Sequence, residues 1–122
     1  MMLAAVVPLV ILQGADYFQL LRWKSGTVPV DLSGYTGRMQ IRETVDSPTV
    51  LLSLTTENGR MALGGAAGTI ALSLTNEATR SCWWTAGVYD IELVDSGEPE
   101  KVIRLIRGPI STIKEVTREV AR

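Results

Sequence analysis

The acidic side chains of the C-terminal half come nearest to a reactive site in their types and spacing. Asp90 and Glu92 stand two residues apart, so in a strand they share one face, and two carboxylates are what glycoside hydrolysis requires. We expect both to point to solvent rather than to act as a catalytic pair. Asp95, Glu98 and Glu100 offer oxygen atoms for a hard cation, but solvating a turn between two strands is the simpler role for them.

Other reactive groups are missing from the sequence. It contains no His and a single Cys, Cys82, so no hydroxyl has a histidine base and no thiolate pair could hold zinc. The glycine-rich run 64–68 lacks the Lys-Ser/Thr that follows in a phosphate loop. We therefore predict no enzyme activity, no catalytic residues, no metal site and no cofactor.

The composition is that of one folded domain. The 122 residues are 46% hydrophobic and 20% charged, which suits a chain with a substantial core. One cysteine cannot form an internal disulfide, so packing must hold the domain together. The net charge of −1 gives no long-range attraction to nucleic acid. The sequence predicts a single domain that does not bind nucleic acid.

An apolar segment opens the chain. Residues 1–12 contain no Lys or Arg, precede no cleavage site, and fall short of the ~20 residues of a membrane span. We interpret residues 1–13 as a strand or arm rather than a signal peptide, and we predict no membrane contact. Pro8 cannot donate to a central ladder and favours an edge position. The segment is rich in β-branched side chains, and four of these form a candidate interface: Val6, Val7, Val10 and Ile11.

Strand-like runs closed by turn residues recur along the rest of the chain. One helical turn is expected at 76–81 with Asn76 as its N-cap, and Asn58-Gly59 is a strong hairpin signal. No long amphipathic helix is predicted. We expect strands at 6–13, 16–24, 28–32, 36–44, 49–55, 60–63, 69–75, 87–95, 102–108 and 110–116.

These runs predict an all-β fold, an immunoglobulin-like antiparallel β-sandwich over residues 14–118 with an extended N-terminal strand or arm and a tail at 119–122. Tyr89 precedes Ile91 by two residues, the spacing of a tyrosine corner and the second cysteine of immunoglobulin domains. We expect Tyr89, Ile91 and Trp23 to be structural. The period-2 pattern predicts the core residues Met39, Ile41, Leu72, Leu74, Tyr89, Ile91, Ile103 and Leu105.

Trp83 and Trp84 complete the candidate interface. Neighbouring residues of an extended segment face opposite ways, so one ring can enter the core while the other is forced outward. An exposed Trp often marks a binding contact. The alternative is a loop that folds back over both rings.

The order of the motifs resembles a known family. The segments 13–17, 22–24, 30–42, 68–74, 78–79, 88–93, 104–108 and 115–118 together resemble small immunoglobulin-like sandwich proteins of tailed bacteriophages. They are also similar to the N-terminal domain of phage baseplate upper proteins. The run Cys82-Trp83-Trp84 departs from that pattern.

The resemblance implies a structural virion component of the neck, tail or baseplate region, assembled in the bacterial host cytoplasm. Its partners would be other copies of itself, in a homo-oligomer, and other virion proteins. The alternative is a carbohydrate- or receptor-binding fibre or decoration module that uses loops at one end of the sandwich, including Trp83 and Trp84.

Overall fold

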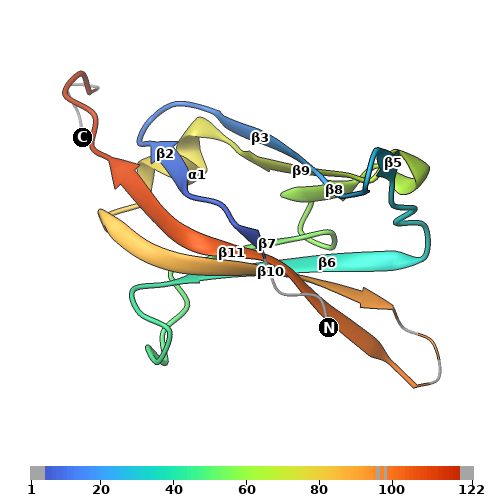
Figure 1. Ribbon diagram of the computed structural model, residues 1–122. Helices are drawn as coiled ribbons and strands as arrows, with labels where there is room; N and C mark the ends of the chain where they lie inside the picture. The colour runs from blue at the N-terminus through green and yellow to red at the C-terminus, as the bar shows by residue number, and fades with distance from the viewer. Residues whose placement is uncertain (1–4, 96, 98, 119–122) are drawn as a thin grey trace.

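The computed structural model describes residues 5–95, 97 and 99–118, and in it two sheets face each other (Figure 1). The larger sheet has the order β1 (Ala5–Val6), β11 (Lys101–Ile113), β10 (Ala86–Asp95), β6 (Tyr35–Arg42) and β7 (Leu52–Thr55), and β2 (Leu9–Leu12) also pairs with β11. The smaller sheet has the order β3 (Tyr17–Arg22), β9 (Thr69–Leu74) and β8 (Met61–Leu63). The predicted immunoglobulin-like β-sandwich is confirmed.

The remaining elements are short. They are the ribbon of β4 (Lys24–Ser25) and β5 (Val28–Pro29), the 3-10 turn η1 (Gly65–Ala67) and the helix α1 (Asn76–Arg80). The first four residues of the predicted arm, and the predicted tail at 119–122, lie outside the described residues.

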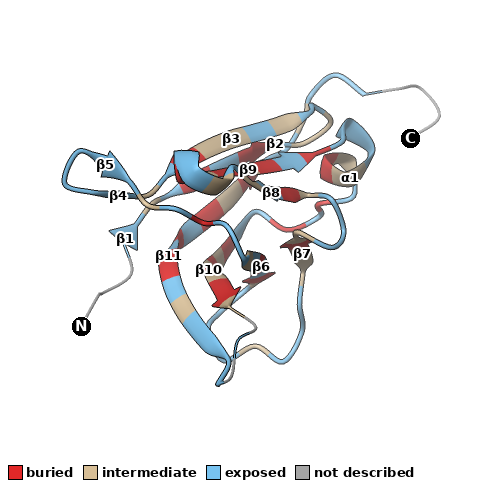
Figure 2. Cartoon of the chain, turned by 90° about the vertical axis from the view of Figure 1, so that its right-hand side faces the viewer, coloured by how far each residue is buried: buried red, intermediate tan, exposed pale blue. Residues whose placement is uncertain are grey.

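The core is formed by buried residues of both sheets, and Figure 2 shows these residues spread over the strands of both. Of the eight predicted core residues, all are buried except Ile103, which is half-buried: Met39, Ile41, Leu72, Leu74, Tyr89, Ile91 and Leu105. Ile91 has no exposed surface. The period-2 pattern therefore identified the inner faces of β6, β9 and β10.

A β-bulge changes the pattern within β11. Its register against β10 shifts between Ile91 and Glu92, so that Ile91 pairs with Ile106 while Glu92 pairs with Arg104. The extra residue is Leu105, and both Leu105 and Ile106 are buried. A bulge inserts one residue into one strand and resets its alternation. Arg104 and Arg107 consequently project from the same face, although they stand three positions apart.

The N-terminal segment pairs with its own sheet, at the edge that Pro8 predicted. β1 and β2 run parallel to β11 in one constant register, from Ala5 opposite Ile106 to Leu12 opposite Ile113. That register places Pro8 opposite Pro109, which has no N–H to donate to the N-terminal segment. The strands therefore separate into β1 and β2 at this point, although the Val7 N–H still reaches the Arg107 carbonyl oxygen at 2.9 Å.

Several predicted elements differ from the structure. Only Val28 and Pro29 of the run 28–32 form a strand, because the chain then turns to the η1 loop, where the Leu32 N–H donates to the Gly65 carbonyl oxygen. The runs 102–108 and 110–116 are one continuous strand, β11, that ends at Ile113.

Two turn predictions are also corrected. Asn58-Gly59 carries the chain from β7 in the large sheet to β8 in the small sheet rather than closing a hairpin, and the Asn58 side chain accepts the N–H groups of Thr55 and Arg60 there. The N-cap of α1 is Thr75, whose hydroxyl accepts the Ala78 N–H, and not Asn76.

Candidate functional site: the outer face of the large sheet

Charged side chains form columns on the outer face of the large sheet. The register sets Arg38 beside Glu92 and Glu92 beside Arg104 in one row, and Gln40 beside Asp90 and Asp90 beside Arg107 in the next. Paired residues of adjacent strands share a face. The face therefore carries basic residues on β6, acidic residues on β10 and basic residues again on β11.

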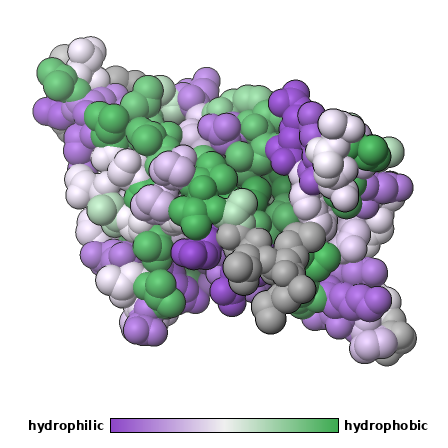
Figure 3. Space-filling view, viewed as in Figure 1, coloured by the Kyte–Doolittle hydropathy of each residue, from purple (hydrophilic) through white to green (hydrophobic). Residues whose placement is uncertain are grey.

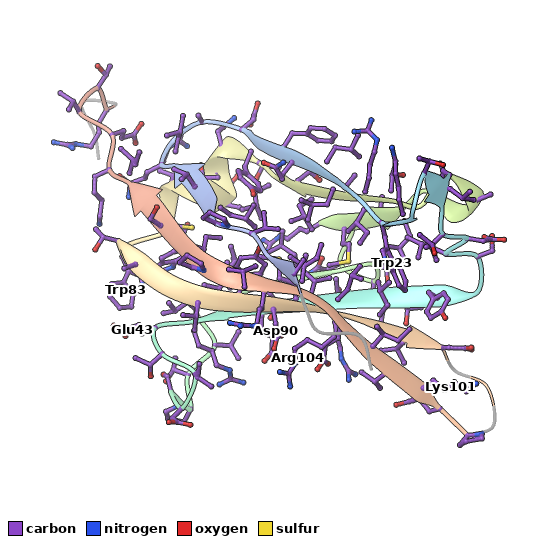
Figure 4. The ribbon with its side chains drawn as sticks, in the orientation of Figure 1. Trp23, Glu43, Trp83, Asp90, Lys101 and Arg104 are labelled. Carbon is purple, nitrogen blue, oxygen red and sulfur yellow. The ribbon has the colours of Figure 1, made fainter. Side chains whose placement is uncertain are left out.

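Two ion pairs link these columns. The Arg38 guanidinium donates to the Glu92 carboxylate at 2.8 Å, and Arg104 lies 3.7 Å from the Asp90 carboxylate. Figure 4 shows Asp90 and Arg104 projecting from the same side of the sheet. Burial of Asp90, reinforced by the charge of Glu92 and opposed by the nearby arginines, raises the pKa of Asp90 above its ordinary value. The acidic column is thus partly withdrawn from water.

The same face is concave. An open depression of about 720 Å³ extends from Val6 on β1 to Val45 beyond the end of β6. The charged residues of the three columns line it, and its remaining floor is apolar, with Val88 and Pro109 side by side. The depression therefore has a charged half and an apolar half.

An apolar strip lies at the edge of this face. Every second side chain of residues 6–12 points outward, because Leu9 and Ile11 point into the core. The outward row of β11 beside this segment is Arg107, Pro109, Ser111 and Ile113, of which Pro109 and Ile113 are apolar, and Ile113 pairs directly with Leu12. We call this set the apolar strip: Val6, Pro8, Val10, Leu12, Pro109 and Ile113. Figure 3 shows apolar surface on the side of the molecule where β2 and β11 lie.

The strip is well exposed. Val6, Val10, Leu12 and Ile113 expose 57%, 48%, 53% and 56% of their surfaces. Together with the two exposed prolines they present on the order of 400 Å² of apolar surface, a size that marks interaction sites on soluble domains.

The structure separates the six residues predicted to form an interface. Val6, Val10 and Trp83 are exposed and Val7 is half-buried. Ile11 and Trp84 are 1% and 3% exposed and belong to the core, so their predicted interface role is wrong. Their neighbours alternate outward, as period 2 requires.

Trp83 lies apart from the charged columns. It is 63% exposed and sits at the end of the molecule away from Lys101 (Figure 4). Its carbonyl oxygen accepts a hydrogen bond from the Lys114 ammonium group. The two neighbouring Trp rings thus divide between core and surface, and the alternative of a loop covering both does not occur.

The three residues predicted to be structural lie in or against the core. Ile91 is fully buried, and Trp23 is half-buried and packs on the core. The buried Tyr89 hydroxyl donates to the Val7 carbonyl oxygen, so Tyr89 ties the N-terminal segment to β10 rather than closing a local corner. Burial raises the pKa of Tyr89.

The acidic residues considered for a cation do not gather. Within the described residues, no group of three or more His, Cys, Asp or Glu side chains could hold a metal ion. Glu98 lies outside those residues. The described part of the chain also contains no helix long and apolar enough to cross a bilayer.

Sequence reasoning missed most of the charged and apolar surface. Arg104 and Arg107 share a face only because of the bulge, and Leu12 and Ile113 meet only because β2 pairs with β11. Residues 6–12 are apolar throughout, so the available signal was the period of two alone, which places one row of any strand inward and the other outward.

No protein-family model and no curated protein matches the chain. Two solved structures resemble it in fold. One is described as parallel homodimers of the extracellular domains of the voltage-gated sodium channel beta4 subunit that explain its role in cell–cell adhesion. It is 9% identical to this chain, with a TM-score of 0.41, and the match covers 95% of this chain and 98% of that chain. The other, from photo-crosslinking analyses of multimeric cell-adhesive interactions of these beta subunits, is 10% identical with a TM-score of 0.41 over 93% and 96%.

The predicted structural component of a tailed-phage virion finds no counterpart in these comparisons and is not retained. The family resemblance and the virion localisation are tested by no match and stay predictions.

Proposed function

We propose that this domain is a binding module that self-associates through the apolar strip. The observation that carries the proposal is the outer row of residues 6–12, which is apolar at every position and lies uncovered at the edge of the large sheet. Burying apolar surface is the main driving force of protein association. No described part of this chain packs over the outer row of residues 6–12, so a partner could bury it.

A second copy is the partner that the strip fits best. Residues 5–12 carry no charge, so a two-fold axis through the strip sets apolar side chains against apolar side chains with no like charges opposed. Arg107 and the ion-paired columns border the strip as a polar rim, and an apolar centre with a polar rim is the usual anatomy of an interface.

The association occurs by face-to-face packing rather than by strand addition. β1 and β2 form an edge, but Pro8 stands in the middle of it and has no N–H to offer a further strand. Proline on an edge strand is a common protection against sheet extension.

Sedimentation velocity over a concentration series tests the proposal. Wild-type protein should form dimers or larger species as its concentration rises. Val10→Asp places a charge in the strip and should leave the protein monomeric. Phe18→Asp is the matched control, because Phe18 is 67% exposed on β3 of the other sheet, and it should associate like the wild type.

Thermal melts of both variants establish that they are folded. A wild type that stays monomeric at millimolar concentration contradicts the proposal. So does equal loss of association in both variants, which would place the contact elsewhere.

A further inference from the structure

The apolar half of the depression is bounded by two arginines. Val88 pairs with Arg42 on one side and with Pro109 on the other, and Arg107 follows in the next row. Val6 and Val45 stand at the rims. An apolar floor thus lies between two guanidinium groups.

These two arginines differ from the other pair in the depression. Glu92 neutralises Arg38, and Asp90 neutralises Arg104. Within the described residues, neither Arg42 nor Arg107 forms an ion pair with an acidic side chain. The depression therefore carries two positive charges in excess, both on its apolar half.

Arg42 is held in position without being neutralised. Its Nη1 donates to the Ser47 carbonyl oxygen at 2.8 Å and its Nη2 donates to Gln40 Oε1 at 2.9 Å. Both acceptors are neutral. A guanidinium that is already fixed loses less side-chain entropy when a ligand binds, and its remaining N–H groups can still donate.

The combination selects a particular ligand chemistry. Guanidinium groups pair with carboxylates in bidentate geometry, and the floor of Val88 and Pro109 would accept an aliphatic side chain. A nucleic acid fits less well, because a continuous row of phosphates would pass over Asp90 and Glu92.

We propose that this half of the depression binds an acidic segment of a partner protein, in which an apolar side chain contacts Val88 and Pro109 while flanking carboxylates pair with Arg42 and Arg107. This site overlaps the self-association surface at Val6 and Pro109, so the acidic segment and a second copy of the chain would compete for these two residues. The negative charge of the segment complements the two arginines of the site. The net charge of the whole domain, −1, would not attract the segment.

Fluorescence anisotropy with a labelled peptide, acetyl-Glu-Glu-Leu-Glu-Glu-amide, tests this site. The titration is carried out in the Val10→Asp background, so that self-association does not compete. Arg107→Gln should weaken binding about tenfold, as the loss of one charge-assisted hydrogen bond predicts. Arg22→Gln is the matched control, since Arg22 is an exposed arginine on β3 of the other sheet, and it should change the affinity less than twofold.

Two further ligands sharpen the result. Replacing Leu by Ser in the peptide should weaken binding severalfold, because the apolar floor loses its contact. A ten-nucleotide oligothymidylate should bind more weakly than the peptide. The proposal is overturned if the two arginine variants lose affinity equally, if the oligonucleotide binds more tightly, or if the peptide does not bind at millimolar concentration.

Discussion

Arg104 and Arg107 project from the same face of β11, opposite Glu92 and Asp90 of β10, although they stand three positions apart in the sequence. The β-bulge at Leu105 brings this about, because it buries two consecutive side chains, Leu105 and Ile106. The charged columns of the outer face depend on this single irregularity.

The bulge makes Ile106 a core residue, which simple alternation would place outside. Ile106 is 6% exposed, and Ile106→Ala should lower the free energy of unfolding by about 2–4 kcal/mol, the usual cost of truncating a buried aliphatic side chain. Val102→Ala on the same strand, where Val102 is 45% exposed, should cost less than about 1 kcal/mol. Urea denaturation measures both, and equal small losses would show that Ile106 faces solvent.

Gly108 permits the close approach of the N-terminal segment. A Cβ atom at this position would lie 2.4 Å from the Val7 carbonyl oxygen, a backbone atom that cannot move alone. We expect Gly108→Ala to destabilise the domain by about 1–3 kcal/mol, as overpacking does. Gly97→Ala has room for its methyl group, with its nearest neighbour at 3.5 Å, and should be nearly neutral. A thermal melt of Gly108→Ala that matches wild type would disprove the contact.

The Tyr89 hydroxyl links the core to the N-terminal segment. Tyr89→Phe removes its hydrogen bond to Val7 and leaves that carbonyl oxygen without this donor, which should cost about 1 kcal/mol. Hydrogen exchange should also become faster at Val7, whose amide bonds to Arg107. Unchanged exchange at Val7 would mean that the segment is held by its strand pairing alone.

Asp90 gives the domain a predictable response to pH. Its pKa is raised in the folded state, so as the pH falls the folded protein takes up this proton before the unfolded chain does, and the destabilisation by the charged carboxylate is relieved. Above the folded pKa the half-buried carboxylate is charged, and this charge destabilises the folded state. Asp90→Asn should therefore raise the melting temperature at pH 7, and the difference should shrink toward pH 3. A variant that melts below wild type at pH 7 would show that the ion pair with Arg104 outweighs burial.

Local patterns in the sequence were enough to predict the sandwich. Alternation in β6, β9 and β10 identified residues such as Met39, Leu72 and Ile91 as core, because a strand buried on one face repeats every two residues. Pro8 likewise predicted an edge position. These signals depend only on neighbours along the chain.

The site itself depends on contacts that such patterns do not encode. The parallel pairing of β2 with β11 decides that Leu12 meets Ile113, and the bulge decides that Arg104 and Arg107 share a face. Ile11 and Trp84 were wrongly assigned to the surface for the same reason. Each stands next to another apolar residue, so the sequence alone does not decide which of the two neighbours faces the core.

Hydrogen–deuterium exchange at low and high protein concentration tests self-association through the apolar strip most directly. We predict that exchange slows with concentration in peptides covering residues 5–13 and 107–113, and that it stays constant in peptides covering β3 and β9. Exchange that is independent of concentration throughout, or slower only in β3 and β9, would contradict the proposed function.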